Sequence, residues 1–349
     1  MSSVRLLVRV LGTTVVGIAL FLQTSALGAG AAPAQSNVTL RLGYFPNVTH
    51  ASAIVGVEGG IFQQKLGNNV KLETSTFNAG PAAVEALNSG ALDATYIGPN
   101  PAINAYAQSG GEAIRIISGA TSGGAFLVVK PGIKSAKDLK GKQVASPQLG
   151  NTQDVALRTW LKKKGLKTDP AGGGDVSIVP QDNAQTLDLF KQGQLDGAWV
   201  PEPWATRMVQ EGGGKVLVDE STLWPKGQYV TTQLIVRTAF LKDHPDAVKR
   251  LLEGQVAAND LIKSDPAKAQ NLVGQGINNA TGKPLAADVI AASFKNLTFT
   301  NDPIATSLRK SAKDAEAAGL LKAVDLKGIY NLKLLNQALT KQGEPTVKS

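Results

Sequence analysis

The sequence predicts an α/β protein, and three observations support this class. Short β-rich runs alternate with amphipathic helical segments, Gly or Pro stands at most of their junctions, and 43% of the 349 residues are hydrophobic. The chain carries 36 Lys plus Arg against 27 Asp plus Glu, which is an ordinary globular composition and argues against a disordered or fibrous chain. This length suffices for two domains, each with its own core.

The first unit begins with an alternating apolar run at residues 38–44, which predicts its opening strand. Pro81 and Gly90 bracket a short apolar segment, as expected for a helix with Pro at its first position and Gly past its end. In full, we expect strands at 38–44, 70–74, 94–97, 113–118 and 125–130, and helices at 51–59, 82–87 and 102–108.

The second unit is expected to begin near Pro131 and to repeat the same alternation. Its helix at 153–164 has Asn151 or Thr152 as a cap and Asp154 in its first turn. We expect strands at 144–146, 176–179, 198–200 and 215–218, a helix at 183–192, a returning strand at 231–237, and then helices beginning at 245 and covering 266–273, 286–297, 304–318 and 331–340.

An internal echo links the two units. Residues 87–94 and 190–198 both show a helix ending at Gly, followed by Leu-Asp and a strand. A Pro-containing turn follows that strand in each case, so the two halves are predicted to repeat one β-α-β arrangement around a shared cleft.

Residues 1–34 have the features of a secretory signal peptide. Arg5 and Arg9 precede an apolar stretch from 10 to 22, and small residues accumulate from Ala29 to Ala34. The alternative is an uncleaved anchor, although the apolar run is shorter than the roughly 20 residues of a spanning helix. We therefore expect export to the periplasm or the extracytoplasmic cell surface.

Composition excludes several kinds of site. The chain has no Cys, which excludes disulfides, thiol nucleophiles, cysteine-ligated metals and the acylated cysteine of a lipoprotein. Only two His are present and no phosphate-binding Gly motif occurs, so neither a metal site nor a cofactor is expected. The net charge of +9 concentrates partly in residues 235–349, with 16 basic and 11 acidic side chains, away from the expected cleft, which argues against nucleic acid.

Several motifs carry a family resemblance. These are LGYFP at 42–46, NSGALD at 88–93, GPNP at 98–101, DLKGKQVA at 138–145 and LDGAWVPEP at 195–203. With them the chain resembles extracytoplasmic solute-binding proteins of ABC importers, in the nitrate/sulfonate/taurine group and most closely the aliphatic sulfonate-binding proteins. The motifs are mainly structural, so they bear more on fold and transport than on the ligand.

The resemblance implies the type II periplasmic-binding fold, with two α/β lobes joined by two hinge strands. The β-rich runs at 125–130 and 231–237 are then the crossings, near residues 128–132 and 230–234. Lobe I would comprise residues 35–129 plus 233–349, and lobe II residues 130–232.

In open α/β sheets, ligands bind beyond the carboxyl ends of the strands, at loops and helix N-termini. Here those loops are rich in Gly, Asn, Thr and Ser and contain no Lys or Arg, so an anion would meet amides and hydroxyls. The candidate ligand-binding residues are Asn47, His50, Gly80, Ala82, Ala83, Gly98, Asn100, Thr121, Ser122, Asn151, Thr152, Trp199, Glu202, Trp204 and Thr232.

Three of these residues leave alternatives open. Trp199 and Trp204 could wall an organic tail or could pack in the core. Glu202 could receive the amine of an aminosulfonate, or it could be a first-turn Glu that pairs with Arg207. The helix starts could equally be ordinary caps.

The resemblance implies a monomeric binding protein that delivers a small oxyanion to a permease with a cytoplasmic ATPase. Aliphatic sulfonate is the leading ligand, and taurine, nitrate and a thiamine-precursor-like heteroaromatic are the alternatives. An enzyme similar to pyrimidine-precursor synthases would need a cysteine-rich motif, which this chain lacks. A lobe that feeds a receptor remains a third possibility.

Overall fold

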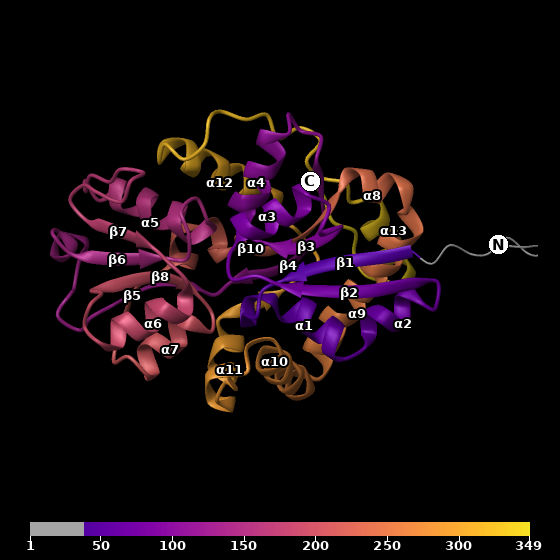
Figure 1. Cartoon of the computed structure of the whole chain (residues 1–349), viewed down its shortest axis with the longest axis horizontal. Coiled ribbons are helices and arrows are strands. Elements are labelled where there is room, and N and C mark those ends of the chain that lie inside the picture. Colours follow the sequence, from indigo (N-terminus) through magenta and orange to yellow (C-terminus); the bar gives the residue numbers. More distant parts are fainter. Residues whose placement is uncertain (1–37) are drawn as a thin grey trace, which may run out of the picture. The chain divides into compact units, whose positions relative to one another are not determined.

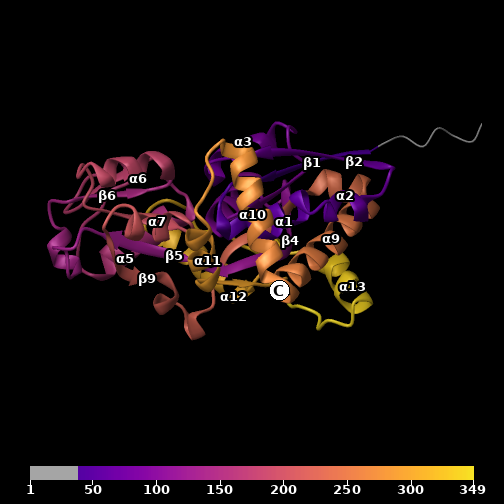
Figure 2. The same ribbon diagram turned by 90° about the horizontal axis from the view of Figure 1, so that it is seen from below.

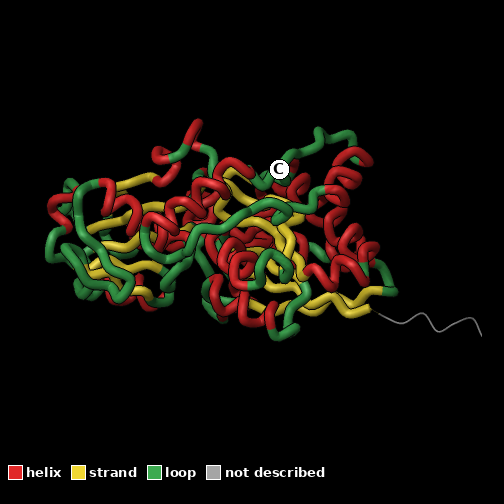
Figure 3. The backbone as a smooth tube through the Cα atoms, turned by 90° about the horizontal axis from the view of Figure 1, so that it is seen from above, coloured by secondary structure: helices red, strands yellow, loops and turns green. Residues whose placement is uncertain are grey.

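Two mixed β-sheets, each with helices on both faces, organise the part of the chain that the computed structural model describes, residues 38–349 (Figure 1). The strands form two separate groups in the tube view (Figure 3). The signal peptide predicted for residues 1–34 lies outside the described residues. Two β-sheets covered by helices confirm the predicted α/β fold class.

The first sheet has the strand order β11-β4-β10-β3-β1-β2. β1 is parallel to β2 and β3, with Val38 opposite Val70, whereas β10 runs antiparallel to β3 and β4. Its strands are β1 (Val38–Tyr44), β2 (Val70–Thr76), β3 (Ala94–Ile97), β4 (Ile114–Gly123), β10 (Val230–Arg237) and β11 (Leu297–Phe299).

Helices cover both faces of this sheet, because its strands are apolar on both sides. Leu40, Leu42 and Tyr96 pack on one face with α1, α2, α9 and α10, whereas Ile97 and Ile116 pack on the other face with α3, α4 and α12 (Figure 1). The helices are α1 (Ala51–Glu58), α2 (Ile61–Leu66), α3 (Gly80–Asn88), α4 (Pro99–Gln108), α8 (Thr238–Asp243), α9 (Pro245–Ser264), α10 (Pro266–Thr281), α11 (Ala287–Lys295), α12 (Ala305–Ala317) and α13 (Lys333–Lys341).

The second sheet has the order β7-β6-β8-β5-β9, with β6 parallel to its two neighbours and β5 antiparallel to β8 and β9. Leu157 and Trp160 of α5 pack on one face, and Phe190 of α6 and Met208 of α7 pack on the other. The elements are β5 (Ala125–Val129), β6 (Gln143–Ser146), α5 (Thr152–Lys163), β7 (Ser177–Pro180), α6 (Asn183–Lys191), β8 (Gly197–Pro201), α7 (Trp204–Gln210) and β9 (Lys215–Asp219).

The chain passes from the first sheet to the second at Gly123 and Gly124. Both residues have positive φ, 84° and 73°, which a residue with a side chain rarely adopts. β5 therefore belongs wholly to the second sheet, so the predicted boundary after residue 129 falls five residues later than the change of sheet. The return lies between β9 and β10. We call the parts built on the first and second sheets lobe I and lobe II.

The C-terminal helices of lobe I also contact lobe II. α11 lies beside α7 (Figure 2), and Thr159 of α5 donates a hydrogen bond to the Asp314 carbonyl of α12, with an Oγ1–O distance of 3.2 Å. In residues 38–349 no helix is long and apolar enough to cross a membrane.

Candidate functional site

A small cavity lies between the two lobes, at the carboxyl ends of strands from both sheets. Its volume is about 20 Å³, the size of one water molecule or one small polar group. We call it the interlobe cavity, and its lining residues are Phe45, Asn47, Thr49, His50, Asn78 and Gly98 of lobe I, Pro147, Asn151, Thr152, Gln153, Asn183 and Pro201 of lobe II, and Thr231 and Thr232 beside the return crossing.

Three hydrogen bonds hold the lobes together around this cavity. The indole of Trp204 donates to Asn47 Oδ1 at 2.8 Å, and Asn78 Nδ2 donates to Asp182 Oδ2 at 3.2 Å. The Thr49 amide donates to the Glu202 carbonyl at 3.4 Å. The lobes are therefore closed on each other, and a solute larger than the cavity can enter only when they separate.

Several polar atoms at the cavity have no partner. Within residues 38–349, the hydroxyls of Thr152 and Thr232 and the Oδ1 of Asn183 are buried and make no hydrogen bond. Native proteins leave few such groups, since each costs about 1–3 kcal/mol when it is unpaired. Lobe II supplies Thr152 and Asn183, and lobe I supplies Thr232. Unpaired groups from both sides of one cavity are typical of a site that a polar ligand completes.

His50 is a neutral hydrogen-bond donor at this cavity. Its ring is buried, stacks on Phe45 with 4.3 Å between centroids, and accepts the Phe45 amide at Nδ1 over 3.3 Å. Burial lowers the pKa of His50 to about 3, so the ring is uncharged at neutral pH. With Nδ1 as acceptor, the proton resides on Nε2, which is then free to donate.

The N-terminus of α5 adds backbone donors. Thr152 and Gln153 occupy its first two positions, whose amides have no partner inside a helix. Asn151 makes no side-chain capping bond to them. Neither Lys nor Arg lines the cavity, so an anion here would meet amides, hydroxyls, an imidazole and the positive end of the α5 dipole.

A second cavity of about 210 Å³ adjoins the first and shares Asn47, Asn78 and Asn183 with it. We call it the mouth cavity. Its apolar lining includes Phe77, Leu187, Trp204, Ile277 and Leu285, and its charged lining consists of Asp182, Asp188, Arg207 and Lys283. A solute with its polar head in the interlobe cavity could place a short tail in the mouth cavity.

The structure brings together about half of the predicted site residues. Asn47, His50, Gly98, Asn151, Thr152 and Thr232 line the interlobe cavity. Trp204 lines the mouth cavity, and Ala82 lines a more open depression next to Asn78. Their ligand contacts remain predictions.

Trp199, predicted as a candidate ligand-binding residue, does not line the cleft. It is fully buried in the core of lobe II, packs edge-on against Trp160 with 6.1 Å between centroids, and donates to Glu220 Oε2 at 2.7 Å. Trp199 is on β8 with its side chain on the α5 face of the sheet, away from the strand ends. The core alternative is the observed one.

Glu202, predicted as a possible partner for a ligand amine, is a second candidate that the structure assigns to another role. Its carboxylate accepts hydrogen bonds from the Thr206 amide (3.1 Å) and hydroxyl (2.9 Å), from Ser293 (3.2 Å) and from Asn296 (2.7 Å). These donors occupy both oxygens, so none is left for a ligand amine. The predicted pairing with Arg207 is also absent, because Arg207 binds Glu211 at 2.7 Å.

Five further candidates do not line the interlobe cavity. Thr121 donates to the Thr49 carbonyl, Ser122 accepts the Tyr229 amide, and Asn100 donates to the Ser311 carbonyl, so each has a structural partner. Ala83 is in the lobe I core, and Gly80 packs against Pro101.

Sequence reasoning missed Thr49, Asn78, Gln153, Asn183 and Thr231, which line the cavity. Asn183 had a usable signal, since it starts a helix directly after β7, a strand whose carboxyl-end loop was left out of the candidates. The other four lie in or next to loops that the sequence nominated.

Comparison with known proteins follows this geometry. Residues 33–275 match the model of the NMT1-like family. The chain belongs to this family. Among its relatives, the taurine-binding periplasmic protein of Escherichia coli is 28% identical over 190 residues, which are 54% of this chain and 57% of that protein. The putative aliphatic sulfonates-binding protein of Bacillus subtilis is 24% identical over 297 residues, 82% of this chain and 84% of that protein.

A solved structure has the same fold. The alkanesulfonate-binding protein SsuA of Xanthomonas axonopodis pv. citri, bound to MOPS, superimposes with a TM-score of 0.69 at 20% identity and covers 82% of this chain and 95% of its own. Family and fold agree with the resemblance seen in the sequence. This NMT1-like chain is a solute-binding protein.

Proposed function

We propose that this protein is the extracytoplasmic binding component of an ABC importer and captures an aliphatic sulfonate between its lobes. The observation that carries the proposal is the pair of unpaired buried hydroxyls of Thr152 and Thr232, which come from the two lobes and line one cavity without any Lys or Arg. An oxyanion head accepts hydrogen bonds from hydroxyls and amides and is favoured at the N-terminus of α5.

The mouth cavity favours an organic oxyanion over nitrate. Its apolar wall of Phe77, Trp204 and Leu285 has a use only if the solute carries a tail. Burial of one methylene group contributes about 0.8 kcal/mol, so even a short alkyl chain adds measurable affinity.

Taurine is the second candidate, and one observation favours it. Asp182 and Asp188 line the mouth cavity, where an ammonium group would lie if the sulfonate occupied the interlobe cavity. In this proposal Asp182 and Asp188, rather than Glu202, pair with the ammonium group of taurine.

Capture would proceed by closure of the lobes. A ligand bridging Thr232 of lobe I and the α5 N-terminus of lobe II makes its full set of contacts only in the closed form, and so shifts the population toward it. The closed form would then deliver the solute to the permease and its cytoplasmic ATPase.

A thermal-shift series tests this proposal. Butanesulfonate, ethanesulfonate, taurine, nitrate and a thiamine precursor are added separately to the purified protein. We expect the melting temperature to rise with butanesulfonate, and less with ethanesulfonate and nitrate. Stabilisation by the thiamine precursor alone, or by none of the oxyanions, would contradict the proposal.

A further inference from the structure

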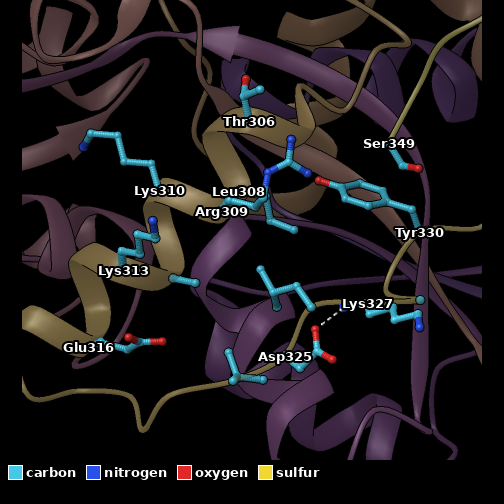
Figure 4. A pocket seen from close by; sticks show the side chains of 14 residues that line it. Thr306, Leu308, Arg309, Lys310, Lys313, Glu316, Asp325, Lys327, Tyr330 and Ser349 are labelled. Atoms are coloured by element: carbon cyan, nitrogen blue, oxygen red, sulfur yellow. Dashed lines mark hydrogen bonds between the residues drawn. The ribbon is translucent and has the colours of Figure 1, made fainter.

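A larger cavity, of about 850 Å³, lies on lobe I away from the cleft, between α12 and residues 324–330 (Figure 4). We call it the C-terminal pocket. It shares no lining residue with the interlobe cavity. Its charged side chains are Arg309, Lys310, Lys313 and Lys327 against Glu316 and Asp325, which gives four positive and two negative charges.

Most of these cations are available to a ligand. Lys310 forms an ion pair with Asp314, whereas within residues 38–349 no ion pair engages Arg309, Lys313 or Lys327. The Asp325 carboxylate is occupied locally, because it accepts the Lys327 amide at 2.9 Å. Glu316 and Asp325 are likewise outside any ion pair among residues 38–349, so three unpaired cations face two carboxylates and the lining keeps a small positive surplus.

Tyr330 provides a second kind of unpaired donor. Its hydroxyl is buried and has no hydrogen-bond partner in the described part of the chain. Figure 4 shows this hydroxyl beside the guanidinium of Arg309. Burial raises the pKa of Tyr330 and Arg309 opposes that rise, so the hydroxyl keeps its proton. A guanidinium and a hydroxyl side by side can both donate to one oxyanion.

The wall behind these donors is apolar. Leu308 and Ala312 of α12 are buried, and Val324 and Leu326 are partly buried against the same core cluster of lobe I. A hydrophobic wall next to unpaired donors fits a molecule with an apolar body and one charged head, rather than a bare inorganic ion.

We propose that the C-terminal pocket is a second ligand site, which binds a small organic anion. Its oxyanion head contacts Arg309, Tyr330 and Lys313, and its apolar body packs against Val324 and Leu326. This site differs in kind from the cleft, because the interlobe cavity contains no cationic side chain.

The probe for this site is phenyl phosphate, titrated into the purified protein by calorimetry. We expect saturable binding in the millimolar range or tighter, weakened about tenfold by Arg309→Gln or Lys313→Gln and measurably by Tyr330→Phe. The matched control is Lys242→Gln, which removes an exposed cation of α8 and should leave phenyl phosphate binding unchanged.

Two further probes define the ligand class. Inorganic phosphate supplies the head alone and should bind at least about tenfold more weakly, and benzyl alcohol supplies the body alone and should not bind. No saturable binding of phenyl phosphate, or binding that Arg309→Gln and Lys313→Gln leave unchanged, would overturn the site. Equal affinity for inorganic phosphate would overturn the assigned ligand class.

Butanesulfonate separates this site from the cleft. Its tight binding in the cleft should be the same in wild type, Arg309→Gln and Lys313→Gln, because these residues lie outside the cleft; any weaker binding of butanesulfonate at the C-terminal pocket should fall in both variants. Phenyl phosphate binding that is lost in Thr152→Val and retained in Arg309→Gln would place the probe in the cleft and overturn the C-terminal pocket.

Discussion

Two clusters of buried polar groups lie between the lobes, and they differ in how fully they are paired. Around Glu202, both carboxylate oxygens have donors, two of which come from lobe I, Ser293 of α11 and Asn296 directly after it. At the interlobe cavity, Thr152, Thr232 and Asn183 have none. The paired cluster ties the lobes together without a ligand, whereas we propose that a ligand accepts hydrogen bonds from the unpaired Thr152 and Thr232 hydroxyls. Hydrogen-bond pairing therefore distinguishes the structural Glu202 cluster from the proposed ligand site at the interlobe cavity.

The largest expected effect is at Glu202. Glu202→Ala leaves Asn296 and Thr206 without their acceptor in a buried place, so we expect a loss of about 3 kcal/mol of unfolding free energy by chemical denaturation. Glu211→Ala, which removes an exposed carboxylate paired with Arg207, should cost about 1 kcal/mol or less.

Glu202→Gln completes this comparison. It keeps one acceptor and the side-chain shape, so taurine affinity should stay at the wild-type value. A large loss of taurine affinity in this variant would show that the Glu202 carboxylate does bind the ligand amine.

The next effect is the pH dependence that Glu220 confers. This carboxylate is buried against the indoles of Trp199 (2.7 Å) and Trp224 (3.3 Å), and burial raises its pKa to about 7. Because the folded state holds this proton more tightly than the unfolded state, its contribution is complete below pH 4.5 and is lost as pH rises through 7. The total is of order 3 kcal/mol.

Melting curves at several pH values test this assignment. Glu220→Gln should flatten the fall in melting temperature between pH 4.5 and 7 relative to wild type. An unchanged slope in this variant would show that Glu220 does not titrate in that interval.

A third prediction concerns closure itself. A methyl group on Gly98 of lobe I would overlap the Thr152 hydroxyl of lobe II, although its φ of −71° suits alanine. Gly98→Ala should therefore fold normally and bind butanesulfonate at least about thirtyfold more weakly, which corresponds to about 2 kcal/mol. Gly132→Ala, where a new Cβ would meet no atom within 4 Å, is the control and should bind like wild type.

The smallest expected effects compare two threonines of α5. Thr152→Val removes an unpaired hydroxyl, so it should leave stability nearly unchanged and weaken butanesulfonate about tenfold. Thr159→Val removes a hydroxyl bonded to the Asp314 carbonyl, so it should lose about 1 kcal/mol of stability and keep full affinity. The reverse pattern would break the distinction between paired and unpaired groups.

The sequence predicted the α/β class and most of the elements, because apolar periodicity and Gly or Pro punctuation act locally. It also located the cleft, since ligand loops follow strand ends. It could not tell whether Trp199 faces the core or the cleft, because alternate residues of β8 face opposite sides of the sheet and both sides are buried. Nor could it show that Ser293 and Asn296, about 90 residues away in the chain, donate hydrogen bonds to the Glu202 carboxylate.

The sequence analysis placed the outgoing crossing near residues 128–132, whereas the chain changes sheets at Gly123 and Gly124. The apolar run at 125–129 has the same character in either sheet, and only its pairing with β8 and β9 assigns it to lobe II.

A calorimetric titration of butanesulfonate at two salt concentrations tests the central claim most directly, namely that neutral donors from both lobes bind an oxyanion. The proposal predicts one tight site per chain, distinct from any weaker binding at the C-terminal pocket. The affinity of this tight site should change less than about twofold between about 50 and 500 mM NaCl and fall about a hundredfold in Thr152→Val/Thr232→Val. Absence of binding, a steep fall in affinity with salt, or full affinity in the double variant would contradict it.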